Sequence, residues 1–120
     1  MRLLLVEDDE DLCIVTKEVL QTFGYDVEYV NTIQDALAFL QLHRDVRLVI
    51  SDYYLPDGTG LDLMVSVQKT VDNGGPPFIF VSGQLDVKAE KIRQMGGKDV
   101  LIKPVGMREL SDAIKQQIGI

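Results

Sequence analysis

Five short runs of apolar, mostly branched residues punctuate the chain, and no feature of the sequence constrains its fold more. Each run is about one strand long and lacks the polar alternation of a strand with one face in water. We expect strands at residues 3–6, 27–30, 48–51, 78–81 and 100–102. Strands that are apolar on both faces are typical of parallel sheets covered by helices on both sides.

The segments between the runs have apolar residues three and four positions apart, the spacing of a helix with one buried face. We expect these buried faces to consist of Leu12, Val15, Val19 and Phe23; of Ile33, Ala36, Leu37 and Leu40; of Leu61, Met64 and Val65; of Leu85, Ala89 and Ile92; and of Met107, Leu110, Ile114 and Ile118. Strand and helix therefore alternate five times. This alternation predicts an α/β fold, a doubly wound, five-stranded parallel (βα)5 sheet with right-handed crossovers.

The size and charge of the chain limit what it can be. Its 120 residues suit one domain, which we expect to span residues 1–120. The net charge of −7, from 19 acidic against 12 basic residues, disfavours nucleic acid and anionic membranes as direct partners, because both need clustered Lys and Arg. The apolar run 3–6 is too short for a signal peptide or a membrane span.

Cysteine content indicates the compartment. Cys13 is the only cysteine, so neither an intramolecular disulfide nor a thiolate metal cluster can form within the chain. We therefore expect a cytoplasmic protein, with Cys13 as a small core or half-buried residue on the first helix.

Charged and polar residues follow the predicted strands, at the edge of a parallel sheet where functional crevices lie. If strands one, three, four and five are adjacent and strand two is at the outer edge, the strand order is 2-1-3-4-5 and one shallow pocket collects Glu7, Asp8, Asp52, Ser82 and Lys103. Asn31 and Thr32 follow the edge strand and are typical of a helix cap, as is Asp9 at the start of the first helix.

The residues of this pocket favour phosphoryl transfer with a metal ion. Three carboxylates close together repel one another and need a cation, and without His or Cys the oxygen-preferring Mg²⁺ fits best. Asp52 is the candidate nucleophile, and Lys103 and the Ser82 hydroxyl can contact phosphoryl oxygens. Any catalysis would be directed at the protein itself, so we do not expect an enzyme with a separate substrate.

Four motifs in this order resemble the receiver domains of bacterial response regulators, and together they cover essentially the whole chain. They are Val6-Glu7-Asp8, the segment 52–60, Val81-Ser82-Gly83 and Lys103-Pro104. The resemblance implies a flavodoxin-like, CheY-like fold that takes part in a two-component phosphorelay. In that family a sensor histidine kinase or a phosphotransfer protein donates the phosphoryl group, and the face made by the fourth helix, fifth strand and fifth helix then changes.

The resemblance also implies roles for individual residues. Asp52 would be the phospho-acceptor, Asp8 a direct Mg²⁺ ligand, Glu7 a ligand mainly through water, and the Tyr54 backbone carbonyl a further ligand. Ser82 and Lys103 would contact the phosphoryl group. The peptide between Lys103 and Pro104 would be cis.

One position departs from the family pattern. Receivers usually carry Tyr or Phe three residues before the Lys, where the ring follows the Ser or Thr hydroxyl, but here that switch position is Val100. An alternative therefore stays open, a degenerate receiver that docks proteins without regulated phosphorylation. An aspartyl-phosphate phosphatase fits badly, because the residue two after Asp52 is Tyr54, and a flavin-phosphate binder fits badly because Glu7-Asp8-Asp9 would repel the anion.

Overall fold

The main sheet has five parallel strands in the order β2-β1-β3-β6-β7. The computed structural model describes residues 2–71, 74–83 and 89–119. The strands of this sheet are β1 (Arg2–Val6), β2 (Asp26–Val30), β3 (Val46–Asp52), β6 (Phe78–Ser82) and β7 (Asp99–Ile102). With only these strands counted, the order is the predicted 2-1-3-4-5, and each lies within two residues of its predicted bounds.

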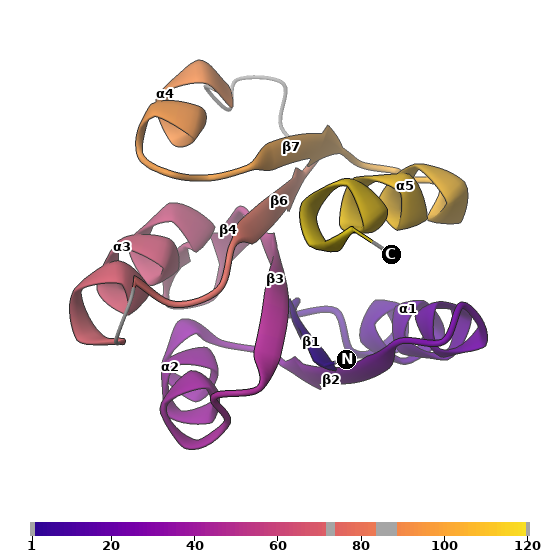
Figure 1. Cartoon of the computed structure of the whole chain (residues 1–120), viewed down its shortest axis with the longest axis horizontal. Coiled ribbons are helices and arrows are strands. Elements are labelled where there is room, and N and C mark those ends of the chain that lie inside the picture. The colour runs from indigo at the N-terminus through magenta and orange to yellow at the C-terminus, as the bar shows by residue number, and fades with distance from the viewer. Residues whose placement is uncertain (1, 72–73, 84–88, 120) are drawn as a thin grey trace.

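Helices cover both faces of the sheet (Figure 1). Their bounds are α1 (Glu10–Thr22), α2 (Ile33–Leu42), α3 (Gly60–Thr70), α4 (Ala89–Gln94) and α5 (Met107–Ile118). Helices α1 and α5 lie on one face, whereas α2, α3 and α4 lie on the other (Figure 1). Two cores result: Leu20 of α1 and Ile114 of α5 belong to one, and Leu40 of α2, Leu63 of α3 and Ile92 of α4 belong to the other. No described helix is both long and apolar enough to cross a membrane.

The predicted buried face of α1 is wrong. Leu12, Val15 and Phe23 are 39%, 56% and 49% exposed, and the residues that face the sheet are Cys13, Thr16 and Leu20. Both sets have helical spacing, so periodicity alone could not distinguish them. The phase of the helix is fixed at its start instead, where Asp9 accepts a hydrogen bond from Leu12 N and the Cys13 thiol donates to the carbonyl of Glu7.

The other predicted faces are closer to the structure. Leu110 and Ile114 of α5 are buried, as predicted. In α3 the buried residues are Gly60, Leu63, Met64 and Val67, so of the predicted three only Met64 is buried, while Leu61 is partly buried against the core. Leu85 and the side chain of Ala89 lie outside the described residues, but Ile92 of α4 is buried as expected.

A small hairpin that the sequence did not predict follows β3. Strands β4 (Tyr54–Leu55) and β5 (Gly58–Thr59) pair antiparallel, and Gly58 has a φ of 149°, which favours glycine. Thr59 then begins α3 with a capping box, in which its hydroxyl accepts from Asp62 N and the Asp62 carboxylate accepts from Thr59 N. Gly60 packs so closely that a side chain there would meet the backbone oxygen of Asp52.

Asp57, at the tip of this hairpin, caps a different helix. Its two carboxylate oxygens accept hydrogen bonds from Ile33 N at 2.9 Å and Gln34 N at 3.1 Å. These N–H groups lie at the start of α2, where the helix itself offers them no acceptor. These bonds lower the pKa of Asp57 below its usual value, and the bond from Ile33 has the largest effect. The hairpin is thus fastened to the N-terminus of α2.

Two truncations on α1 test the corrected face. Leu20→Ala removes a fully buried side chain and is expected to lower the free energy of unfolding by about 2–5 kcal/mol. Val15→Ala, the matched control on the exposed face, is expected to change it by less than about 0.5 kcal/mol. Urea unfolding followed by circular dichroism measures both, and equal losses would contradict the corrected face.

Asp57 provides a pH-dependent test. Asp57→Ala is expected to lower the free energy of unfolding at pH 7 by roughly 1 kcal/mol, because two helix donors lose their partner. A lowered carboxyl pKa contributes stability above the unfolded-state pKa, and that stability is lost as the pH falls through the folded-state value. The deficit of the variant should therefore shrink as the pH falls below about 4, the ordinary pKa of an Asp carboxyl. A deficit of the same size at neutral and acidic pH would show that the charge contributes nothing.

Candidate metal and phosphoryl-transfer site

Three carboxylates meet at the carboxyl edge of the sheet. Glu7 and Asp8 directly follow β1, and Asp52 ends the neighbouring strand β3. One oxygen of each carboxylate lies within 4.8 Å of the others. Glu7 is buried with 4% of its surface exposed, Asp52 is half-buried, and Asp8 is exposed. The structure thus brings the three predicted acids together.

Lys103 joins this cluster from the far edge of the sheet. It follows β7, and its Nζ donates to Glu7 Oε1 at 2.7 Å and to Asp52 Oδ2 at 3.2 Å. Burial alone would lower the pKa of Lys103, but the hydrogen bond to Glu7 and the charge of Asp52 together raise it above its usual value. Lys103 is therefore charged at neutral pH and is shared by two acids.

Lys103 does not balance the charge of the three acids. The hydrogen bond with Glu7, burial and the charge of Glu7 raise the pKa of Asp8, which shows that its ionised form is disfavoured where it stands. Three carboxylates and one ammonium group leave two negative charges, the charge that one divalent cation would neutralise. The ligand atoms are all hard oxygens, which suits Mg²⁺ or a similar ion.

The remaining predicted residues lie on β6, β4 and β7 and in the peptide after Lys103. Ser82 ends β6, next to β3, and is fully buried, and its backbone carbonyl accepts from Lys103 N at 2.7 Å. Tyr54 lies in β4 with its side chain 45% exposed. The peptide between Lys103 and Pro104 is cis, as the resemblance implies. Val100 pairs with Phe80 between β7 and β6 and packs against the core on the side of α3 and α4.

Two of the three residues predicted as helix caps are caps. Asp9 caps α1 and Thr32 caps α2, as expected. Asn31, grouped with Thr32 as a cap, does something else: its side-chain nitrogen donates to the carbonyl of Glu7 at 2.8 Å. Sequence reasoning missed this bond, because it joins two loops whose residues are 24 positions apart.

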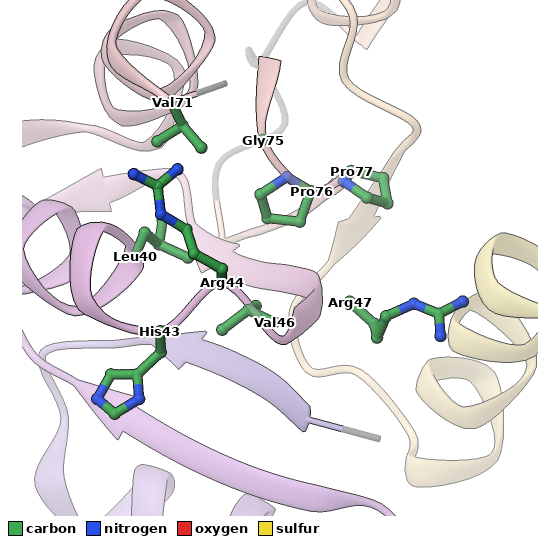
Figure 2. Close-up of a pocket in the computed structure, with 9 residues that line it drawn as sticks. All are labelled: Leu40, His43, Arg44, Val46, Arg47, Val71, Gly75, Pro76 and Pro77. Carbon is green, nitrogen blue, oxygen red and sulfur yellow. The ribbon is translucent and has the colours of Figure 1, made fainter. Parts of the chain in front are cut away.

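Two cavities help to locate the chemistry. One of about 370 Å³ reaches from Glu7, Asp52 and Lys103 into the space between α1 and α5, where its walls are mostly apolar. Another of about 590 Å³ lies near the opposite end of the sheet, around Leu40 and Pro76. Figure 2 shows that Arg44 there extends toward Val71 while Arg47 points to the opposite side. The described residues that line this second cavity include no acid, and none of them belongs to the carboxylate cluster.

Comparison with known proteins gives a consistent result. Residues 3–115 match the family model described as "Response regulator receiver domain". The two-component response regulator ORR12 of rice (Oryza sativa subsp. japonica) is 34% identical over 99 residues, which is 80% of each chain. The luminescence regulatory protein LuxO of Vibrio campbellii is 34% identical over 100 residues, or 83% of this chain but 22% of LuxO.

Solved structures agree with the sequence matches. The signal receiver domain of a putative LuxO repressor protein from Vibrio parahaemolyticus superposes with a TM-score of 0.87 at 29% identity, over 98% of this chain and 89% of that one. A CheY-like receiver domain protein from Methanospirillum hungatei gives 0.87 at 30% identity, over 98% and 93% of the two chains.

The chain therefore belongs to the response regulator receiver domain family. It has the CheY-like α/β fold, and phosphorylation-dependent signalling in two-component systems is the general function of its class. The acids and the lysine meet at the carboxyl edge of the sheet, where such a function would need them.

The repulsion among the acids predicts that one of them costs stability. Asp8→Asn is expected to raise the free energy of unfolding at pH 7 in EDTA by a few tenths of a kcal/mol to about 1 kcal/mol, the scale of exposed charge pairs. Because the folded-state pKa of Asp8 is raised, the gain should vanish at low pH, where Asp8 is protonated in both states. Thermal melts at both pH values measure it, and a loss of stability at pH 7 would contradict this electrostatic account.

Proposed function

We propose that this receiver takes a phosphoryl group on Asp52 in a Mg²⁺-dependent reaction. The observation that carries the proposal is the position of the Asp52 carboxylate, between Lys103 at 3.2 Å and the acids that follow β1. Asp52 is also half-buried at the mouth of the cavity between α1 and α5, where bulk water competes less.

Each neighbouring residue has a task in this proposal. Glu7, Asp8, Asp52 and the backbone carbonyl of Tyr54 would hold Mg²⁺. The ion would supply positive charge against the phosphoryl oxygens. Lys103 would exchange part of its contact with Asp52 for a phosphoryl oxygen, and the Ser82 hydroxyl would donate to another.

The reaction is a simple displacement. A carboxylate oxygen of Asp52 bonds to phosphorus while the bond from phosphorus to the donor breaks, and the donor keeps the electron pair. We propose a sensor histidine kinase or a phosphotransfer protein as donor. The product would act through an output protein or domain by way of the face formed by α4, β7 and α5. The chemistry is confined to this protein's own aspartate, including its later hydrolysis, and we place it in the cytoplasm.

The degenerate-receiver alternative has less support. Val100 is the one position that suggested it, whereas Lys103 bonds to both Glu7 and Asp52, and the ligand oxygens of Glu7, Asp8 and Asp52 lie within 4.8 Å of one another. The family match also contains nothing that favours a docking role without phosphorylation.

Intact-mass measurement tests the acceptor. After incubation with acetyl phosphate and Mg²⁺, the wild-type chain is expected to gain the mass of one phosphoryl group, and Asp52→Asn is expected to gain none. The same reaction with EDTA should give no product, since the acids would then have no divalent cation. An equal gain by wild type and Asp52→Asn would remove Asp52 as the acceptor, and no gain by wild type would favour the degenerate reading.

A further inference from the structure

The backbone carbonyl of Glu7 has two side-chain partners from different elements. Asn31 Nδ2, in the loop after β2, donates to this oxygen at 2.8 Å, and the buried thiol of Cys13 on α1 donates to it at 3.2 Å. The N–H of Glu7 instead continues the strand pairing by donating to Val30 O at 3.1 Å. Hydrogen bonds thus hold both the N–H and the carbonyl group of Glu7.

This carbonyl belongs to the peptide that joins Glu7 to Asp8. Its orientation sets the directions in which both side chains leave the backbone, so a bond that fixes the peptide also fixes the two carboxylates. Of the two donors, the amide of Asn31 is the stronger, because a thiol is a weak donor. A carbonyl oxygen can only accept, and therefore the nitrogen of the Asn31 amide must face it.

The same loop also reaches the hairpin that follows Asp52. The N–H groups of Ile33 and Gln34, two and three residues after Asn31, donate to the Asp57 carboxylate at the tip of this hairpin. Segment 31–34 therefore bonds to the loop that carries Glu7 and Asp8 at one end and to the hairpin that carries Tyr54 at the other.

From these contacts we infer that Asn31 is a positioning residue for the cation site: it bonds to the backbone carbonyl of Glu7 rather than to a carboxylate that would hold the ion. Its amide holds the Glu7–Asp8 peptide in the orientation that keeps both carboxylates near Asp52, within a loop that also braces the hairpin after Asp52. The inference rests on the metal site proposed above. It assigns a task to the edge strand β2, which itself contributes no residue to the acid cluster.

Loss of this bond should weaken cation binding more than it weakens the fold. Residues that hydrogen-bond metal ligands from outside the site typically contribute about 10–100-fold in metal affinity. We expect Asn31→Ala to raise the dissociation constant for Mg²⁺ by about that factor. In Asn31→Ser the side chain is polar and suited to a loop but too short to reach the carbonyl, so the dissociation constant should rise as much. This second variant serves as a control in case Asn31→Ala fails to fold.

Thr32 offers a matched control in the same loop. Its hydroxyl accepts from Asp35 N at 3.1 Å and caps α2. Thr32→Ala should therefore lower the free energy of unfolding by about 1 kcal/mol while leaving the Mg²⁺ dissociation constant unchanged.

The experiment is a Mg²⁺ titration of the four ¹⁵N-labelled chains, followed through the amide resonances of Glu7, Asp8 and Asp52, with thermal melts in EDTA beside it. Wild-type affinity in Asn31→Ala and Asn31→Ser would overturn the inference, as would a Thr32→Ala variant that loses as much affinity as they do. If wild type itself shows no Mg²⁺-dependent shift at these residues, the proposed metal site is contradicted. That result differs from a normal wild-type titration with unchanged Asn31 variants, which would contradict only the role of Asn31.

Discussion

A buried carboxylate needs a partner, and the pairing of Glu7 with Lys103 is the constraint on which the functional end of this fold depends. Glu7 is 4% exposed, so its charge would be costly without the ammonium group 2.7 Å away. The two residues are 96 positions apart in the chain. They meet only because β3 and β6 lie between β1 and β7, and the same arrangement places Asp52 beside both.

The sequence predicted the parts of the structure that depend on local pattern and on strand ends. The five main strands could be read as apolar runs, and Glu7, Asp8, Asp52 and Lys103 could be placed together because parallel strands end at one edge. The predicted face of α1 failed for a physical reason: Leu12 and Val15 match the helical period as well as Cys13 and Thr16 do. Only the hydrogen bonds at the start of the helix choose between them.

Contacts between loops were beyond the reach of sequence reasoning. Asn31 and Asp57 are ordinary loop residues by composition, and their partners, Glu7 and Ile33, are each 24 positions away. No periodicity or motif in the sequence indicates either bond. Val100 is the opposite case, because the sequence singled it out and the structure shows its setting: it pairs with Phe80 and packs against the core that contains Ile92 of α4. The aliphatic side chain of Val100 thus meets its neighbours by apolar packing.

The two edges of the sheet carry a consequence of their own. An unpaired edge strand can recruit a strand from another molecule and so begin aggregation, and charged residues or short length discourage this. Strand β2 carries Asp26 and Glu28, and β7 is only four residues long and begins with Asp99. Asp26 and Glu28 are also held by ion pairs with Arg2 and Lys17. Charged side chains and short length thus make both edges poor templates for a strand from another molecule.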